Sequence, residues 1–190
     1  MGVNELPGLD AGIERVLLTQ EQVQGRVRQL GAQITQDYDG QSLLAVGILK
    51  GSAVFLADLI RAIDLPLDYD FVAISSYGAD TRSSGVVRLL KDLDTSVEGR
   101  HVLIVEDIVD TGWTLRLSYL RENMLARRCA SVKVCALLDK PSRRKVDVGV
   151  DYCGFVVEDH FVVGYGLDYE GRFRNLPYVG ILDPAVYAET

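Results

Sequence analysis

The segment Val102-Leu-Ile-Val-Glu-Asp-Ile-Val-Asp-Thr-Gly-Trp-Thr114 decides the fold of this chain. It opens with a short, unbroken apolar run, Val102 to Val105, which is typical of a central parallel strand covered on both faces. Residues 106–112 are predicted to form a loop, and a helix is predicted to begin near Trp113. Three carboxylates, two threonines and a glycine therefore stand between a buried strand and a helix.

The composition of this loop suits a phosphorylated ligand. Gly112 lets the backbone come close to a bound molecule. The helix start offers unpaired N–H groups and a partial positive charge, which favour a phosphate, and Thr111 and Thr114 add hydroxyl donors. The alternative is that Asp110 or Thr111 only caps the helix while the acids are solvated, which is the better interpretation of an isolated Asp-Thr-Gly. The whole combination between a buried strand and a helix favours a binding site.

Further strands and helices alternate on both sides of this segment. Residues 1–18 are predicted to be an irregular lead-in, and residues 75–85 a polar, mobile loop. A helix is expected from the capping-box residue Thr19 to about residues 38–40, and another follows Ser52. Strands are expected at residues 43–48, 67–74, 86–90, 132–138, 153–157 and 161–167. The pattern predicts one α/β domain over residues 1–190, with a mainly parallel sheet flanked by helices and ligands bound at the carboxyl ends of its strands.

Composition and charge exclude several classes of protein. The chain has 190 residues and a formal net charge of −7, so its surface does not attract nucleic-acid phosphates. Its three cysteines lack CxxC spacing, which favours free thiols in a reducing compartment over disulfides or a zinc site. The sequence shows no signal peptide and no apolar stretch of roughly 20 residues. We therefore expect a cytoplasmic protein with no nucleic-acid or membrane partner.

The segment 102–114 resembles the phosphoribosyl pyrophosphate signature of the type I phosphoribosyltransferases. Other stretches resemble the hypoxanthine-guanine branch of that family, namely residues 47–52, 75–77 with 83–85, 137–140, and 161–168 running on to Arg174. The motifs stand in the family's order over most of residues 40–182. The resemblance implies a type I phosphoribosyltransferase fold, with a core of roughly residues 20–150 and residues 151–190 contributing to a small purine-binding hood.

The resemblance also implies an activity and a set of residues that carry it. The enzyme would transfer the 5-phosphoribosyl group of phosphoribosyl pyrophosphate to N9 of hypoxanthine or guanine, giving IMP or GMP and pyrophosphate. Asp110 would be the catalytic base, acting at N7 of the purine. The 5′-phosphate and ribose would meet Glu106, Asp107, Asp110, Thr111, Gly112, Trp113 and Thr114. Trp113 carries little weight, because its position varies in the family.

Pyrophosphate and purine would each have their own residues. Pyrophosphate would meet Lys50, Gly51, Ser76, Tyr77 and Arg174, with a peptide before Lys50 that is often cis in relatives. Ser52 departs from the second glycine of some relatives. The purine would meet Lys140, Phe161, Val162 and Asp168, while Mg²⁺ would be held by Glu106, Asp107 and Asp168. Lysine offers only donors, so Lys140 suits a 6-oxo group and opposes the 6-amino group of adenine.

Other functions remain open at this point. A phosphoribosyltransferase that prefers xanthine or a pyrimidine would have a similar phosphoribosyl site. An RNA-binding regulator could keep the same fold, although the acidity and the intact Asp110, Lys140 and Asp168 disfavour it. An oxidoreductase is disfavoured because no GxGxxG follows an early strand. His101 and His160 fit no family motif and are not taken as catalytic. The family implies a homodimer or homotetramer.

Overall fold

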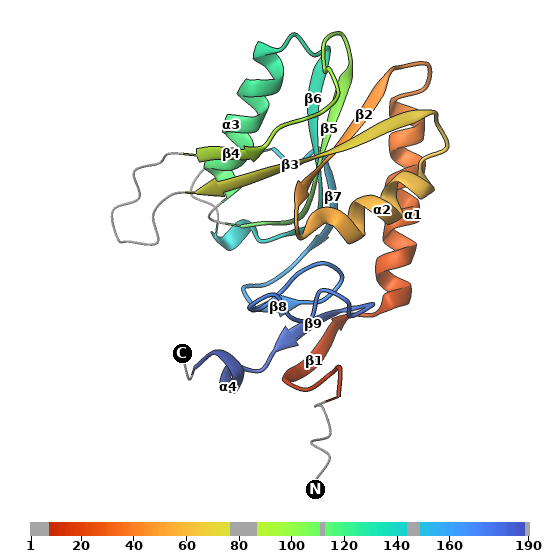
Figure 1. Ribbon diagram of the computed structural model, residues 1–190. Helices are drawn as coiled ribbons and strands as arrows, with labels where there is room; N and C mark the ends of the chain where they lie inside the picture. The colour runs from red at the N-terminus through yellow and green to blue at the C-terminus, as the bar shows by residue number, and fades with distance from the viewer. Residues whose placement is uncertain (1–7, 77–86, 111–112, 144–148, 189–190) are drawn as a thin grey trace, which may run out of the picture.

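The computed structural model describes residues 8–76, 87–110, 113–143 and 149–188. A large sheet and a small sheet form the two parts of the molecule (Figure 1). None of the helices in these ranges is long and apolar enough to cross a membrane. The elements are β1 (Ile13–Leu18), α1 (Gln20–Asp37), β2 (Leu43–Leu49), α2 (Ser52–Ala62), β3 (Leu67–Ser76), β4 (Val87–Lys91), β5 (His101–Val109), α3 (Trp113–Ala126), β6 (Ser131–Asp139), the 3₁₀ turn η1 (Pro141–Arg143), β7 (Tyr152–Val156), β8 (Val162–Val163), β9 (Val179–Leu182) and α4 (Pro184–Tyr187).

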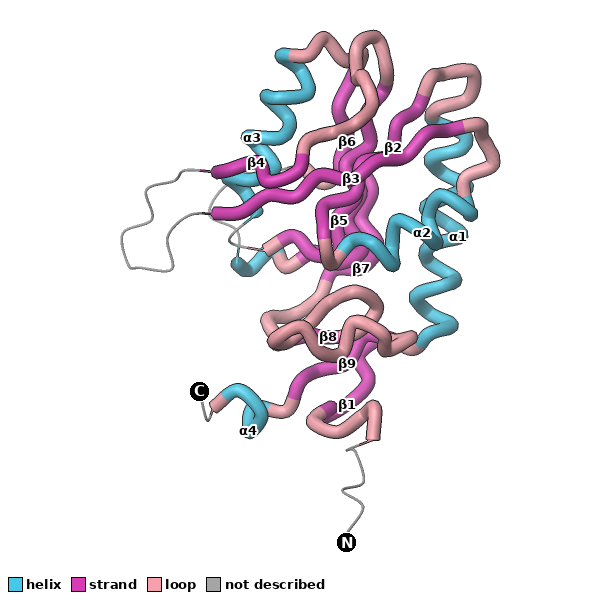
Figure 2. Tube along the Cα trace, viewed as in Figure 1, coloured by secondary structure: helices cyan, strands magenta, loops and turns pink. Residues whose placement is uncertain are grey.

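The large sheet has the strand order β4-β3-β2-β5-β6-β7. All its neighbouring strands are parallel except β4, which pairs with β3 in the antiparallel direction. Helices α1 and α2 pack on one face and α3 on the other, as Figure 2 shows. The mainly parallel α/β sheet expected from the sequence is therefore confirmed.

Helix α1 begins where the sequence predicts it. The Thr19 hydroxyl accepts a hydrogen bond from Gln22 N at 3.3 Å, and the Gln22 side chain accepts one from Thr19 N at 2.8 Å. This capping box satisfies two backbone donors that the helix start would otherwise leave unpaired. The helix then buries Val23, Val27 and Ile34 against the large sheet and α2.

The small sheet corrects the prediction for both ends of the chain. Residues 13–18 form β1 instead of part of an irregular lead-in, because they pair antiparallel with β9. Strand β9 and helix α4 were not predicted from the sequence. The predicted strand over residues 161–167 is reduced to Val162–Val163, since Gly164 and Gly166 adopt φ values of +97° and +101° that turn the chain.

The central strand is also longer than predicted. Residues 106–109 belong to β5 instead of a loop, because β6 continues alongside and supplies the partners Leu138 for Ile108 and Asp139 for Val109. Two of the three acidic residues of the segment, Glu106 and Asp107, therefore have the fixed orientation of strand residues. Consecutive residues of a strand point to opposite faces of the sheet, and these two acids consequently have different surroundings.

Candidate active site

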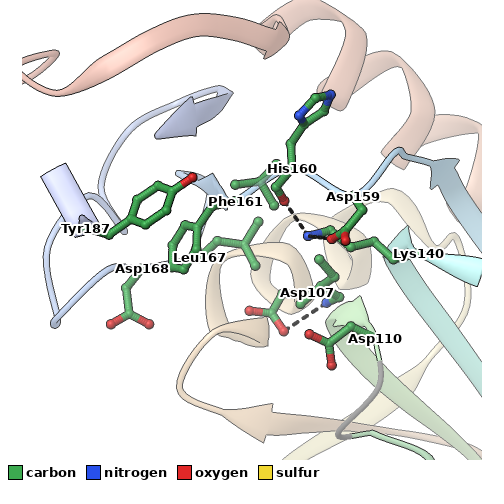
Figure 3. Close-up of a pocket in the computed structure, with 11 residues that line it drawn as sticks. Asp107, Asp110, Lys140, Asp159, His160, Phe161, Leu167, Asp168 and Tyr187 are labelled. Atoms are coloured by element: carbon green, nitrogen blue, oxygen red, sulfur yellow. Dashed lines mark hydrogen bonds and ion pairs between the residues drawn. The ribbon is translucent and has the colours of Figure 1, made fainter. Parts of the chain in front are cut away.

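A cavity of about 470 Å³ lies between the carboxyl ends of β5 and β6 and the small sheet. The large sheet contributes side chains from β5 and from the residues that follow β5 and β6, and the small sheet contributes the chain around β8. Figure 3 shows the carboxylates, the lysine and the aromatic rings that face this space. The lining residues are Asp107, Ile108, Asp110, Lys140, Asp159, His160, Phe161, Val162, Leu167, Asp168 and Tyr187.

Asp107 connects β5 with the turn before α2. Its carboxylate lies so close to Gly51 that a Cβ atom at position 51 would be 1.7 Å from Asp107 Oδ2. The Leu49–Lys50 peptide bond before this turn is cis. Asp107 is only 7% exposed, and its Oδ1 accepts a hydrogen bond from Ile108 N at 2.9 Å. The glycine in Lys50-Gly51 is therefore required by the neighbouring carboxylate.

The chain after β8 packs on the same turn. A Cβ atom at Gly166 would lie 2.1 Å from Gly51 O, so the two backbones are in direct contact. Arg174 then fixes the segment, because its guanidinium donates to Gly166 O at 2.6 Å and contacts Asp168 Oδ1 at 2.5 Å. Asp168 Oδ2 also accepts a hydrogen bond from Gly171 N at 2.7 Å. Asp107, Asp168 and Arg174 are thus held around one turn.

Lys140 follows β6 and extends under the start of β8. Its side chain is buried, and Nζ donates a hydrogen bond to the carbonyl of His160. Asp159 Oδ1 lies 4.0 Å from Nζ. A buried cation with only donors, placed on a cavity wall, can recognise a carbonyl oxygen of a ligand. Phe161 lies next to it and is 41% exposed, so its ring is accessible to a flat ligand.

The arrangement matches known proteins over nearly the whole chain. Residues 16–170 match the family described as the phosphoribosyl transferase domain. The hypoxanthine-guanine phosphoribosyltransferase of Bacillus subtilis is 56% identical over 175 residues, which cover 92% of this chain and 96% of that protein. The chain belongs to the hypoxanthine-guanine phosphoribosyltransferases.

Other members of the family agree. The Mycobacterium avium hypoxanthine-guanine phosphoribosyltransferase is 51% identical, with 93% of this chain and 89% of that protein covered. A solved hypoxanthine phosphoribosyltransferase from Staphylococcus aureus superimposes with a TM-score of 0.90 at 48% identity, covering 96% of this chain and 99% of that one. The type I phosphoribosyltransferase fold and the family resemblance predicted from the motifs are confirmed.

Not every residue that the family resemblance suggested lies on the cavity. Asp107, Asp110, Lys140, Phe161, Val162 and Asp168 line it. Arg174 contacts the lining residue Asp168, and Gly51 lies against the lining residue Asp107. Lys50 is exposed, and Ser76, Trp113 and Thr114 lie by their backbone at the end of β3 and the start of α3. Thr111, Gly112 and Tyr77 lie outside the described residues.

Glu106 occupies a different environment from Asp107. It is 1% exposed, does not line the cavity, and its Oε2 has no hydrogen-bond partner within the described part of the protein. Burial first, and then the negative charge of Asp107, raise the pKa of Glu106 well above its ordinary value. In this family member the acidic pair of the motif therefore divides into one carboxylate facing the cavity and one buried behind it.

Five lining residues were not assigned from the sequence, although two of them fall inside quoted motifs. Ile108 belongs to the segment 102–114 and Leu167 to the stretch 161–168, so their membership of these motifs could have indicated that they line the cavity. His160 is not predicted to act as an acid or base, and in the structure its backbone carbonyl accepts a hydrogen bond from Lys140. Asp159 and Tyr187 had no local signal, because only tertiary contacts bring them to the cavity.

Proposed function

We propose that this protein transfers the 5-phosphoribosyl group of phosphoribosyl pyrophosphate to N9 of hypoxanthine or guanine in purine salvage, forming IMP or GMP and pyrophosphate. The observation that carries the proposal is the cavity, which brings a buried lysine, an accessible aromatic ring and the carboxylates of Asp107, Asp110 and Asp168 together at the carboxyl ends of the strands. The names of its relatives support the same reaction.

The purine side of the reaction belongs to the wall formed by Lys140 and β8. Lys140 donates to the 6-oxo group, and Phe161 stacks on the base while the Val162 backbone binds its Watson–Crick edge. Asp110, at the end of β5, takes or holds the proton at N7 as the new bond forms. An adenine amino group would face donors only, so 6-oxopurines are preferred.

The phosphoribosyl side belongs to the other wall. The 5′-phosphate binds residues 110–114, where the first N–H groups of α3, a helix of 14 residues, provide donors and a partial positive charge. Pyrophosphate binds Lys50, Gly51 and Arg174, with Ser76 and Tyr77 closing over it. Closure is useful because water would intercept a cation-like ribosyl group.

Mg²⁺ is the proposed cofactor. Asp107 and Asp168 are two of the aspartates that line the cavity, and oxygen ligands of this kind suit a hard cation. Among the described residues no group of three or more His, Cys, Asp or Glu side chains is placed to hold a metal. Mg²⁺ usually binds one or two carboxylates and takes its remaining ligands from water and substrate phosphates. Glu106, which is 1% exposed and does not line the cavity, is not included among the proposed metal ligands.

The proposed assembly is a homodimer or homotetramer, and the proposed location is the cytoplasm. The location is supported by the free thiols of Cys129, Cys135 and Cys153, which suit a reducing compartment.

The direct test mixes the protein with phosphoribosyl pyrophosphate, Mg²⁺ and each of hypoxanthine, guanine, xanthine and adenine, and follows the ultraviolet absorbance. Turnover of hypoxanthine or guanine is expected, and a clear excess with xanthine would favour the xanthine-preferring alternative. Turnover of adenine but not hypoxanthine would refute the role of Lys140. Filter binding to RNA at moderate salt tests the regulator alternative, and no retention is expected from a chain of net charge −7.

A further inference from the structure

The C-terminal helix α4 brings an aromatic ring onto the cavity wall. Tyr187 stacks on Phe161, with ring centroids 5.3 Å apart and an angle of 25° between the ring planes. Figure 3 shows the two residues next to each other at the cavity. Tyr169 forms a T-shaped pair with the same phenylalanine, with ring centroids 5.6 Å apart and 85° between the ring planes. Stacked and edge-on pairs are the two arrangements that aromatic rings prefer. Phe161 therefore has one stacked neighbour and one neighbour in a T-shaped arrangement.

The segment that carries Tyr187 also holds the backbone of Phe161. Leu182 N donates to Phe161 O at 2.9 Å, at the point where β9 runs beside β8. Residues 182–187 thus contact both the main chain and the ring of one residue. Residues 182–187 and the wall formed by Lys140 and β8 therefore form a single unit.

Helix α4 is itself fixed to the small sheet. Asp183 N donates to Gly12 O at 2.9 Å, and the Asp183 side chain caps the helix by accepting from Ala185 N at 2.8 Å. Val186 packs into the cluster of the small sheet. The position of Tyr187 is therefore set by contacts that do not involve Phe161, so Tyr187 can orient Phe161 and does not merely follow it.

We propose that Tyr187 is a positioning residue that holds the Phe161 ring ready to stack on the purine; this inference rests on the proposed function. Tyr187 covers one face of Phe161, so the base is left the other face. A half-exposed phenylalanine would otherwise lose rotamer freedom each time a base binds, and fixing the ring beforehand removes that cost. Tyr187 consequently increases affinity for the base.

The effect is restricted to the base. Tyr187 contacts the purine wall, and in Figure 3 it lies on the opposite side of Phe161 from Lys140 and Asp110. The residues proposed for the 5′-phosphate and pyrophosphate belong to the start of α3, the turn before α2, and Arg174. Loss of the Tyr187 ring is therefore expected to change the KM of the base and to leave that of phosphoribosyl pyrophosphate unchanged.

The test compares steady-state constants of Tyr187→Ala, Tyr187→Leu and Tyr187→Phe with those of the wild type. Tyr187→Ala and Tyr187→Leu should raise the KM for hypoxanthine about fivefold, equivalent to about 1 kcal/mol, with kcat and the KM for phosphoribosyl pyrophosphate nearly unchanged. Tyr187→Phe keeps the ring and should restore the wild-type constants. Tyr69→Ala, which removes an exposed tyrosine from β3, is the control for loss of a surface ring.

Each other result decides against the inference. An unchanged hypoxanthine KM in Tyr187→Ala, a wild-type value in Tyr187→Leu, an equal rise in both KM values, or a failure of Tyr187→Phe to restore function would overturn it. Thermal unfolding of each variant shows that the fold persists, and Tyr187→Leu keeps apolar bulk at the position. A wild-type protein that turns over no purine would refute the proposed function. An active wild type together with a Tyr187→Ala variant whose KM for hypoxanthine is unchanged would refute only the role of Tyr187.

Discussion

At the scale of single residues, the proposed proton transfer depends on the carboxylate that follows β5. Asp110→Asn keeps the size and the hydrogen-bonding capacity of the side chain but removes its basicity. We expect kcat to fall by about 10²–10³-fold, which is the usual loss when general acid–base catalysis is removed. The KM for phosphoribosyl pyrophosphate should change by less than about threefold, because ground-state contacts are retained. Steady-state kinetics measure both constants.

The control for this substitution is Asp39→Asn, an exposed aspartate just after α1 and outside the cavity. It should leave both constants as in the wild type. Equal losses of turnover and of phosphoribosyl pyrophosphate binding in Asp110→Asn would contradict the role of this carboxylate as the base.

Glu106 leads to a prediction about pH. Because burial raises its pKa, the folded protein retains this proton at pH values where the unfolded chain has released it. The stability that the proton contributes is therefore complete below the ordinary pKa of 4.5 and is lost as the pH rises towards the folded pKa. Glu106→Gln is neutral throughout. Its advantage in unfolding free energy over the wild type should grow by about 1.4 kcal/mol per pH unit within that window.

Urea unfolding of the metal-free protein and of Glu106→Gln between about pH 5 and pH 8 measures this difference. Two stability curves that run parallel over the whole range would show that Glu106 titrates normally.

The single residues also show what the sequence could and could not reveal. Lys140 was predictable because it follows a strand of the parallel sheet, and the strand ends of such a sheet meet at one edge. Phe161 and Asp168 lie on either side of β8 in the small antiparallel sheet, and only the resemblance of residues 161–168 to a family motif indicated them. The separation of Glu106 from Asp107 does not follow from the sequence, because the sequence predicts a loop over residues 106–112 and β5 instead continues to Val109. Tyr187 lies in no motif, and only the pairing of β8 with β9 brings it to Phe161.

At the scale of elements, the small sheet is positioned by the contact between two turns, one before α2 and one after β8. Gly166 has a φ of +101°, and a Cβ there would meet Gly51 O at 2.1 Å. Gly166→Ala should therefore separate the turns and raise the KM values of both substrates. It should also destabilise the fold by about 1–3 kcal/mol beyond the backbone strain alone.

Gly99→Ala is the matched control, since Gly99 has a φ of +71° with open space where a Cβ would be. It should cost only the strain of the left-handed conformation, about 1 kcal/mol, and leave both KM values unchanged. Thermal unfolding and kinetics of the two variants separate the effect of backbone strain from the effect of the steric clash with Gly51 O. Equal behaviour of the two variants would show that the contact between the turns is unimportant for binding.

Local sequence predicted the elements of the large sheet better than those of the small one. The start of α1 could be predicted because its capping box lies within four residues of the sequence. The buried strands could be predicted because they are apolar runs. Strand β1 instead pairs with β9 over a separation of more than 160 residues, with Ile13 opposite Leu182. Each of these two strands is stabilised by a partner that is distant in the sequence, so the local sequence around either one does not reveal the pairing.

At the scale of the whole molecule, the proposed substrate contacts are divided between the large sheet and the small sheet, so bound ligand should stabilise the fold as a unit. A ligand at about 100 times its Kd adds about 2.7 kcal/mol to the free energy of unfolding. For a chain of this size that corresponds to a rise in Tm of about 5–10 °C. Phosphoribosyl pyrophosphate with Mg²⁺ is expected to give this rise.

Without the divalent ion the rise should be less than about half as large, because Asp107 and Asp168 then face the pyrophosphate charge directly and Coulomb repulsion weakens binding. Differential scanning fluorimetry with Mg²⁺ or with a chelator measures the difference, and inorganic phosphate at equal concentration is the control for non-specific anion effects. Asp168→Asn removes one of the two charges, so its Tm rise should depend less on Mg²⁺ than that of the wild type. An identical Tm rise with Mg²⁺ and with chelator in the wild type would exclude a metal held between these carboxylates and the pyrophosphate.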